Sequence, residues 1–401
     1  MKKIAMFSMG TRGDIQPYLV LSKGLINKGF DVTLGSHPCW RKLVESYGVH
    51  FVSIGPNVDI EMEASKIRGT SKNPMISMLK TMNFVFKLIN NSSNEIYECC
   101  KGKDLIIVSH SQMGATEAES LKIKTINVTL QSEMLPETKR KKTLKDKVVA
   151  AFINPIMAKP YNQIRKKYNL KKVKSMDKVM SKELNLIPIS KYVLETNPYW
   201  EEKNKVIGYW FLEEDEYTPS FELQQFLAQG EKPILLSLGA MSFESNEEVN
   251  KLNCFIEAFS RTNKRAIIQG FNKTRKFVTL PETMIAIDSV PHSWLFKQGY
   301  AVIHHCGFGT TASSMYYGIP SIPIPHVLDQ LSFANHLYRL DVGTKPIKAS
   351  ELNAEVLINT IQELDHHYVF YKSNVLELSN KMYLEAGLEK TIQLIEKSLN
   401  S

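Results

Sequence analysis

Histidines, glycines and threonines gather in one stretch of the second half, in an order that suits the binding of an anion. Residues 304–311 read His-His-Cys-Gly-Phe-Gly-Thr-Thr and follow a short apolar run, Ala301–Ile303, that is typical of a buried parallel strand. Glycines let backbone N–H groups approach a ligand, and threonines commonly begin helices. Because the first N–H groups of a helix lack intrahelical acceptors and the helix dipole is positive there, the stretch predicts a phosphate site. The residues predicted to hold the phosphate are His305, Gly307, Gly309, Thr310 and Thr311.

Two further polar side chains follow the next predicted strand, Ser321–Pro325. Asp329 and Gln330 come after the carboxyl end of this strand, and open α/β sheets bind their ligands at that edge. A carboxylate and an amide beside a phosphate site suit the hydroxyl groups of a phosphorylated sugar. The stretch therefore predicts that the phosphate sits at the helix start and the sugar at Asp329 and Gln330. A tight turn that binds nothing is the alternative for Gly-x-Gly alone.

One carboxylate occupies a comparable place in the first half. Asp14 lies in the turn Met9–Pro17, after the predicted strand Lys3–Ser8 and before the predicted helix Tyr18–Asn27. From position alone, Asp14 is either a helix-capping or solvated turn residue or a group that faces a ligand. His37 and His110 also follow predicted strands, and each is either a hydrogen-bonded structural residue or a rival base at the edge of the site.

Apolar runs and helical spacings alternate along both halves, which predicts an α/β fold with parallel, doubly wound sheets and right-handed crossovers. Besides those already named, the predicted strands are Asp31–Leu34, Val49–Ile54, Leu105–Val108, Thr125–Thr129, Ile234–Leu238, Arg265–Gln269 and Met284–Ile287. The other predicted helices are Trp40–Tyr47, Gln112–Leu121, Glu247–Arg261, Ala354–Leu364, Tyr371–Lys381 and Leu388–Leu399. Two Rossmann-like domains facing an interdomain cleft follow from this alternation.

The length of the chain also favours two domains, because 401 residues are too many for one compact core. The composition shifts between Asn197 and Pro219, where Asn-Pro-Tyr-Trp is followed by the acidic run Glu213–Glu216. We therefore predict a domain of residues 1–205, a second domain of residues 206–386 and a terminal helix in residues 387–401.

The net charge of +9 comes largely from two basic runs, Lys139–Lys147 and Arg165–Lys178. A solvated basic face is the simpler interpretation. Peripheral contact with an anionic membrane is the alternative, because apolar residues accompany the charges. Nucleic acid is not an expected partner, since no recognition motif accompanies the basic residues. Glu61–Glu98 and Val148–Tyr161 are irregular apolar segments, which suit either core packing or an adaptable wall for a lipophilic ligand.

Five cysteines, at positions 39, 99, 100, 254 and 306, show no metal-ligand spacing and no even-numbered disulfide framework. No run approaches the 18 or so apolar residues of a membrane span, and the start of the chain does not resemble a signal peptide. We therefore expect a cytoplasmic protein, in a reducing compartment, without a bound metal.

Taken together, these motifs resemble a known family. His-His-Cys-Gly-x-Gly-Thr-Thr, then Gly318-Ile-Pro, then Pro325 with Asp329-Gln330 resembles the nucleotide-sugar signature of family 1 glycosyltransferases, which have the GT-B fold. The resemblance is strongest to the bacterial and fungal branch that includes sterol glucosyltransferases and antibiotic glycosyltransferases. Residues 10–17, Gly-Thr-Arg-Gly-Asp-Ile-Gln-Pro, resemble the first-loop motif of the family. The resemblance implies that Asp14 is the catalytic base. Thr11 and Arg12 from the same turn, and His37 and His110 from their positions after strands, are candidate acceptor-site residues.

Two other segments carry the resemblance into the donor site. Residues 239–242, Gly-Ala-Met-Ser, resemble the Gly-Ser-Met loop of sterol-type members, with Ala240 in place of the serine. This implies donor contacts from Gly239 and Ser242. Residues 289–296 resemble the nucleobase-binding segment, which begins with a stacking Trp in plant members and with a Ser here. Base contact through the His292 backbone is implied, while Trp294 is either a stacking or a core residue.

The resemblance implies an inverting, metal-independent transferase that needs no cofactor. It would move a hexose, glucose from UDP-glucose, to a hydroxyl of a lipophilic sterol, terpenoid, flavonoid or polyketide. A hydroxyl is about as weakly acidic as water, with a pKa of about 15.7 against about 3.9 for Asp, so the carboxylate must accept the proton while the new bond forms. A nucleotide-sugar epimerase and a non-catalytic nucleotide-sugar-binding protein are the alternatives. A dinucleotide oxidoreductase is disfavoured, because no Gly-x-Gly-x-x-Gly follows the first strand.

Overall fold

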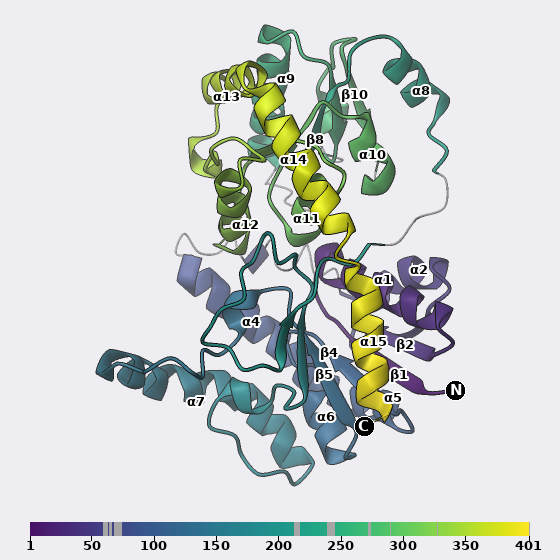
Figure 1. The fold of residues 1–401 in the computed structure, drawn as a ribbon, viewed down its shortest axis with the longest axis vertical. Coiled ribbons are helices and arrows are strands. Elements are labelled where there is room, and N and C mark those ends of the chain that lie inside the picture. The colour runs from purple at the N-terminus through teal and green to yellow at the C-terminus, as the bar shows by residue number, and fades with distance from the viewer. Residues whose placement is uncertain are drawn as a thin grey trace. The chain divides into compact units, whose positions relative to one another are not determined.

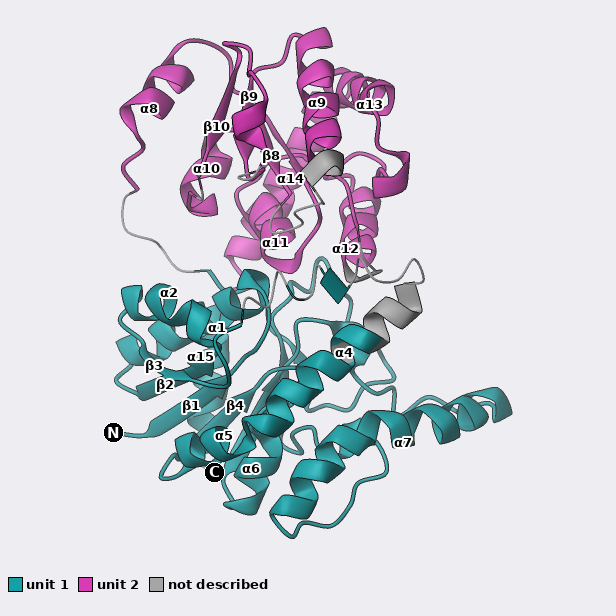
Figure 2. Ribbon diagram, turned by 180° about the vertical axis from the view of Figure 1, so that it is seen from behind, with its two compact units in different colours: residues 1–212, 386–401 teal, residues 213–385 magenta. Residues whose placement is uncertain are grey.

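The computed structural model describes residues 1–58, 63, 66–67, 74–211, 217–238, 245–271, 274–288, 290–326 and 328–400, with the backbone alone at 74–79, 82, 245–247, 328 and 329. The chain forms two compact units (Figure 2). Unit 1 comprises Met1–Leu212 and Ala386–Ser401, and unit 2 comprises Glu213–Glu385. The first unit continues past residue 205 because Ile207 and Gly208 still donate backbone hydrogen bonds to Ile187 and Ile189, at 3.1 and 3.0 Å.

Unit 1 is built on seven parallel strands in the order β3-β2-β1-β4-β5-β6-β7 (Figure 1). All residues of the central strand β4 are buried, as expected for a parallel sheet covered on both faces. The strands of unit 1 are β1 (Lys3–Phe7), β2 (Asp31–Ser36), β3 (His50–Ser53), β4 (Leu105–Val108), β5 (Lys124–Val128), β6 (Leu184–Ile187) and β7 (Asn204–Val206). Sequence analysis predicted the first five and missed β6 and β7.

The helices of unit 1 include one from the far end of the chain. The last helix packs on the first: a Cβ on Gly24 would lie 3.1 Å from Ile392 and 3.2 Å from Leu388. Trp210 Nε1 also donates to Thr391 Oγ1 at 2.8 Å. The described α-helices of unit 1 are α1 (Arg12–Asn27), α2 (Arg41–Ser46), α4 (Pro74–Asn91), α5 (Ser93–Cys100), α6 (Ala115–Ser120), α7 (Leu144–Lys167) and α15 (Gly387–Asn400).

Unit 2 repeats the design with five parallel strands in the order β10-β9-β8-β11-β12. Leu236, Ile268 and Ile303 on these strands pack with Phe255 and Phe259 of α9 in one core. The strands are β8 (Ile234–Ser237), β9 (Ala266–Gln269), β10 (Met284–Ile287), β11 (Ala301–His304) and β12 (Ser321–Pro323). The described α-helices are α8 (Phe221–Ala228), α9 (Ser245–Arg261), α10 (His292–Gln298), α11 (Phe308–Tyr316), α12 (Leu328–Arg339), α13 (Ala354–His366) and α14 (Tyr368–Tyr383).

Both sheets reverse their winding direction beside their first strand. In unit 1 the chain builds β1, β2 and β3 outwards and then returns to the other side of β1 with β4; in unit 2 it does the same with β8 and β11. Ligands of open α/β sheets bind beyond the carboxyl ends of the strands at this switch point. The loop that carries Asp14 follows β1, and the turn that carries His305 follows β11, so each predicted site lies at the switch point of its own unit.

At the predicted site residues, three helix starts differ from the predictions. Helix α1 begins at Arg12 rather than Tyr18, so Asp14 lies in its first turn and Pro17 in its second rather than in the segment before the helix. Helix α11 begins at Phe308, which makes Thr310 and Thr311 its third and fourth residues rather than N-cap residues. Helix α12 begins at Leu328, so Asp329 and Gln330 lie in a first turn rather than in a loop.

The first irregular segment, Glu61–Glu98, contributes mainly to the core where it is described. Its second half forms α4 and the start of α5. Leu88 and Ile89 are buried, and Phe84 and Phe86 pack against the same cluster. Core packing is therefore confirmed for these residues, while the side chains of the methionines at 75, 78 and 82 lie outside the described part.

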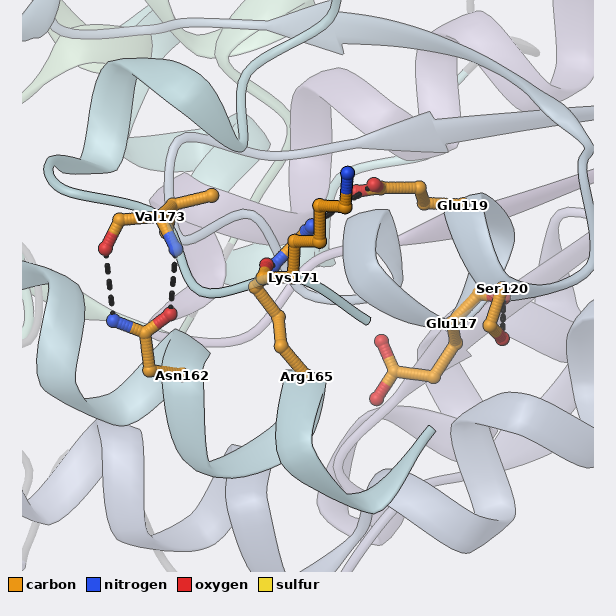
Figure 3. A network of polar contacts seen from close by, with 7 residues as sticks. All are labelled: Glu117, Glu119, Ser120, Asn162, Arg165, Lys171 and Val173. Carbon is orange, nitrogen blue, oxygen red and sulfur yellow. Dashed lines mark hydrogen bonds and ion pairs between the residues drawn. The ribbon is translucent and has the colours of Figure 1, made fainter. Parts of the chain in front are cut away.

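Helix α7, which contains the second irregular segment, is anchored through its carboxyl half. Arg165 is only 4% exposed, binds both carboxylate oxygens of Glu119, and donates from Nε to the Lys171 carbonyl at 2.6 Å (Figure 3). This contact lowers the pKa of Glu119. Asn162 exchanges two hydrogen bonds with the backbone of Val173, at 2.8 and 2.9 Å. Arg165 thus belongs to the interior, although it begins the second basic run.

None of the helices in the described ranges is long and apolar enough to cross a bilayer.

Candidate functional site

A sharp turn joins β11 to α11 in unit 2. Cys306, at its centre, has a φ of +62°, a left-handed conformation that costs a residue with a side chain about 1–2 kcal/mol. The residue is fully buried, and its N–H donates to His304 Nδ1 at 3.2 Å. Burial raises the pKa of the Cys306 thiol well above its ordinary value, so this side chain is a packed structural group. The turn sets the start of α11 directly beyond the carboxyl end of β11.

The first turn of α11 has backbone donors that no side chain caps. Gly307 is the N-cap and no side chain caps the helix; the first i to i−4 bond runs from Thr311 N to Gly307 O at 2.9 Å. The N–H groups of Gly309 and Thr310 precede that bond and therefore have no acceptor inside the helix. Apart from the adjacent residues and the backbone of its own helix, no described atom lies within 4 Å of a Cβ built on Gly309. An anion can approach these donors along the helix dipole without meeting a side chain from that position.

His305 lies over the same turn. A Cβ on Gly307 would come within 2.5 Å of His305 Nε2, so the imidazole can occupy its position only because residue 307 is a glycine. Burial lowers the pKa of His305 to about 4, against a hydrogen bond to the Ser237 backbone that acts in the opposite direction. Its Nδ1 is buried and has no hydrogen-bond partner among the described residues. At neutral pH His305 is thus an uncharged group with one ring nitrogen left for a ligand.

The preceding residue, His304, makes the unit sensitive to acid. Its pKa is lowered to about 3, mainly by burial and in addition by the charges of His305 and His292. Because the folded pKa is below the ordinary 6.5, the unfolded chain binds the extra proton between pH 6.5 and 3. The stabilising effect of the neutral ring is therefore complete above pH 6.5 and is lost as the pH falls, at up to about 1.4 kcal/mol per pH unit.

We predict that His304→Asn flattens the dependence of unfolding free energy on pH between 7 and 5. Asn keeps an oxygen that can accept the Cys306 N–H and adds no titrating group. Urea denaturation at a series of pH values measures the slope, with His50→Asn, at an exposed position, as the control. A slope equal to that of the unsubstituted protein would assign the acid sensitivity to other groups.

The structure also brings two cationic or titratable groups to this turn that sequence analysis missed. His326 follows β12, and its pKa is lowered to about 4 by burial, with the charges of Lys251 and His305 acting in the same direction. Lys251 comes from α9 and is half-buried. The positive charge of Lys251, the dipole of α11 and the backbone donors of the turn after β11 all favour a negatively charged ligand. The position of His326 directly after a strand was a usable signal, whereas nothing local pointed to Lys251.

The other predicted donor residues have more varied surroundings. Thr310 is buried, and the Thr311 hydroxyl is buried without a described partner. Gln330 is 6% exposed and accepts a hydrogen bond from the His326 N–H at 2.8 Å, so its oxygen ties down the residue before α12. The ring of His292 stacks on Phe296. Gly239, Ser242 and the side chain of Asp329 lie outside the described part.

Trp294 is a packing residue in this unit. Its ring tilts against Tyr217 with centroids 5.1 Å apart, at the edge of a core cluster that contains Leu295 and Phe296. This supports the core interpretation of Trp294 rather than a stacking role. The base of a nucleotide would therefore need other contacts.

In unit 1, Asp14 combines a capping role with an available oxygen. Its Oδ2 accepts hydrogen bonds from the Thr11 N–H at 2.8 Å and from the Thr11 hydroxyl at 3.1 Å. A Cβ on Gly10 would lie 2.2 Å from Oδ2, so Gly10 leaves the room that the carboxylate needs. The other oxygen, Oδ1, has no hydrogen bond to a described residue, and the side chain is half-buried. The helix cap fixes the carboxylate and leaves one oxygen able to accept a proton.

The predicted acceptor-site residues come to one edge of the sheet. β2 and β4 flank β1, so the loops that carry His37, Asp14 and His110 are neighbours. Trp40 Nε1 donates to the Gly10 carbonyl at 3.1 Å and ties two of these loops together. Arg12 is exposed in the first turn of α1.

The two histidines at this edge both have buried ring nitrogens without a described hydrogen-bond partner. His37 is fully buried, and burial lowers its pKa to about 4. Neither of its ring nitrogens has a described partner, and neither does Nδ1 of His110. The neutral imidazole of His37 can accept or donate one hydrogen bond to a ligand, but it does not bring a charge to the site.

A buried polar network supports the same edge. Gln112 Nε2 donates to Asn127 Oδ1, and Asn127 Nδ2 donates to Thr129 Oγ1, both at 2.6 Å. The Tyr18 hydroxyl donates to the Val128 carbonyl at 3.2 Å, and its pKa is raised well above the ordinary value by burial and by the charge of Asp14. Because every bond is buried, the network holds the loop after β4 in one arrangement. Sequence analysis did not identify this network.

A metal site is not evident in the described ranges, which hold no group of three or more His, Cys, Asp or Glu side chains placed to share an ion.

Comparisons with known proteins address the two units separately. Residues 4–102 match the family described as "Glycosyltransferase family 28 N-terminal domain", and residues 255–386 match "Erythromycin biosynthesis protein CIII-like, C-terminal domain". The first match contains Asp14 and His37, and the second contains the β11–α11 turn.

The chain is also similar to curated proteins over its whole length. A sterol 3-beta-glucosyltransferase of Saccharomyces cerevisiae is 26% identical over 99% of the chain, and one of Komagataella phaffii is 27% identical over 99%. The matches cover 35% and 34% of those proteins, so the chain spans about a third of their length.

Solved structures share the fold. The glycosyltransferase of kitacinnamycin has a TM-score of 0.74 at 18% identity, with 98% of both chains covered. The glycosyltransferase VinC, solved in complex with DTDP, has a TM-score of 0.75 at 15% identity, with 99% of both chains covered. The two parallel α/β sheets and these solved structures show the GT-B fold, and the family domains in both units and the relatives along the whole chain support a family 1 glycosyltransferase.

Proposed function

We propose that the protein transfers a hexose, glucose from UDP-glucose, to a hydroxyl group of a lipophilic small molecule, with inversion at the sugar and without a metal ion. The observation that carries the proposal is the start of α11, where backbone donors without a side-chain cap lie beside the open position at Gly309 and a neutral His305. A diphosphate suits such a site. The sterol 3-beta-glucosyltransferases among the relatives support a lipophilic acceptor, and the DTDP complex of VinC supports a nucleotide diphosphate donor.

In the proposed reaction each unit has one task. Unit 2 holds the diphosphate through the α11 amides, with His305 donating a hydrogen bond and Lys251 adding positive charge. These groups stabilise the charge that collects on the leaving UDP, which is the usual source of the largest catalytic effect. In unit 1 Asp14 Oδ1 accepts the proton of the acceptor hydroxyl while the oxygen attacks the anomeric carbon. Attack from the face opposite the leaving group gives inversion.

The test is a mass-spectrometric screen of UDP-, TDP- and GDP-sugars against sterols, flavonoids, macrolides and diacylglycerol. We expect an acceptor that gains one hexosyl group, with release of UDP, and turnover that is unchanged by a metal chelator. The anomeric configuration of the product, measured by NMR, tests inversion.

Three other results would replace the proposal. Conversion of the donor to its sugar epimer without a glycosylated acceptor would indicate a nucleotide-sugar epimerase. Calorimetric binding of UDP-glucose without any product would indicate a non-catalytic binding protein. Absence of both binding and product would remove the donor site from α11.

A further inference from the structure

Helix α7 carries an apolar face that no described residue of unit 1 covers. Its first half presents large apolar side chains to solvent, with Phe152 73% exposed and Ile156 65% exposed. Leu144, Val148, Phe152 and Ile156 recur every four residues and therefore form one ridge, and Val149 and Ile153 widen it on the same side. This continuous stripe is unlike the scattered apolar residues of an ordinary surface.

The remainder of the helix is fixed to the body of unit 1. Ala158, Tyr161 and Ile164 are buried, and they fall on the side of the helix opposite to the apolar stripe. Tyr161 also makes an edge contact with Phe86 of α4, at a centroid distance of 5.3 Å. Figures 1 and 2 both show the first half of α7 extending beyond the other helices of unit 1. The stripe thus lies on a helix, which contains Pro155 and Pro160, rather than in a loop.

A basic run immediately precedes the stripe. Residues 139–147 hold six basic side chains and one acidic side chain, Asp146, and all six basic residues are exposed. Arg140 pairs with Glu137, whereas Lys141, Lys142 and Lys147 form no ion pair with a described carboxylate. Exposed lysines lie at both ends of the stripe, because Lys145 and Lys159 project beside it.

This charge arrangement does not serve the stability of the helix. The amino end of a helix carries a partial positive charge and favours anions, so a cluster of lysines there costs stability. Exposed Phe and Ile side chains likewise gain nothing from the folded unit. A partner with an apolar interior and an anionic surface would bind both the apolar stripe and the lysines, and a bilayer with anionic headgroups has that layered structure.

We propose that the first half of α7, with residues 139–147, is a docking surface for an anionic phospholipid bilayer. The apolar stripe enters the boundary between headgroups and acyl chains, and the lysines contact the phosphates around it. Docking would bring a transferase to the phase in which a lipophilic acceptor dissolves. This consequence rests on the proposed function, but the docking itself does not.

The experiment is flotation of the full chain with vesicles, in the absence of any sugar nucleotide. We expect binding to vesicles of phosphatidylcholine mixed with phosphatidylglycerol, weaker binding in high salt, and little binding to phosphatidylcholine alone. Phe152→Glu should lower the partition coefficient by about tenfold or more, since it removes apolar contact and adds a repelled charge. Lys141→Gln together with Lys142→Gln should lower it roughly 25-fold, about fivefold for each lost charge.

The chain offers a closely matched control. Phe221, the first residue of α8 in unit 2, is also 73% exposed, so Phe221→Glu makes the same chemical change at the same exposure away from α7. We expect it to bind vesicles as the unsubstituted protein does. Circular dichroism of each variant checks that α7 remains folded, and retention of UDP binding separates loss of docking from loss of the donor site.

Four results would overturn the proposal. The first is equal binding to neutral and anionic vesicles, and the second is equal loss of binding in Phe152→Glu and Phe221→Glu. The third is a concentration-dependent dimer that Phe152→Glu abolishes, which would make a second copy of the chain the occupant. The fourth is a loss of acceptor affinity in Phe152→Glu with vesicle binding intact, which would make the stripe a wall of the acceptor site.

Discussion

Asp14→Asn is expected to lose glycosyl transfer by two to four orders of magnitude while it still binds UDP. The amide of Asn cannot accept the proton of the attacking hydroxyl, and positioned proton transfer contributes about 10²–10⁴ to a rate. The amide oxygen can still accept the Thr11 N–H, so the helix cap survives in part. Single-turnover kinetics with saturating donor measure the chemical step directly, and calorimetry measures UDP affinity.

The control for this substitution is Asp146→Asn. Asp146 is also the third residue of its helix, and its Oδ2 accepts the Thr143 N–H at 2.9 Å, much as Asp14 accepts the Thr11 N–H at 2.8 Å. Both variants therefore lose the same carboxylate charge at the same helix position. In an assay without vesicles, Asp146→Asn should transfer normally. Similar turnover in the two variants would restrict Asp14 to capping α1.

The second large effect is expected at Gly309, in donor binding. Gly309→Ala should weaken UDP-glucose binding by at least about tenfold, or about 1.4 kcal/mol, because the new methyl group enters the space in front of the α11 amides. The unliganded protein should be as stable or more stable, since Ala in place of Gly favours a helix by up to about 1 kcal/mol. Calorimetric titration and urea denaturation measure the two quantities on the same sample.

Two other glycine substitutions sharpen this prediction. Gly13 is the second residue of α1, as Gly309 is of α11, and its Cβ would meet only Thr11 Oγ1 at an ordinary 3.7 Å, so Gly13→Ala should leave UDP affinity unchanged. Gly307→Ala should lower both affinity and stability, because its methyl group displaces the His305 ring. Unchanged affinity in Gly309→Ala would mean that the diphosphate does not bind at this helix start.

The strands that carry both sites were predictable because their signal is local. A parallel strand buried on both faces reads as a short apolar run, and every run predicted as a strand is a strand in the structure. The turn after β11 was equally predictable from the sequence, since glycine spacing and two histidines mark it. β6 and β7 were missed: Leu184–Ile187 contains a buried Asn185, which pairs with Asn204 at 2.7 Å and interrupts the apolar pattern.

Helix starts were harder because they depend on which of several adjacent caps is used. The start of α1 had a readable signal in Thr11-x-x-Asp14, the capping pattern that the helix in fact uses. Pro17 obscured it, because proline is commonest in the first turn of a helix rather than in the second. The approach of Lys251 to His326 joins segments far apart in the chain and has no local trace.

The return of α15 to unit 1 has a consequence for how the protein is made. Leu388 and Ile392 cover the Gly24 surface of α1, the helix that positions Asp14, yet they are synthesised after the whole of unit 2. At ribosomal speeds of about 5–20 residues per second, the first sheet therefore waits on the order of ten seconds or more for its final layer. During that interval the nascent chain exposes an apolar patch that a chaperone can recognise, and the amino-terminal half matures last although it emerges first.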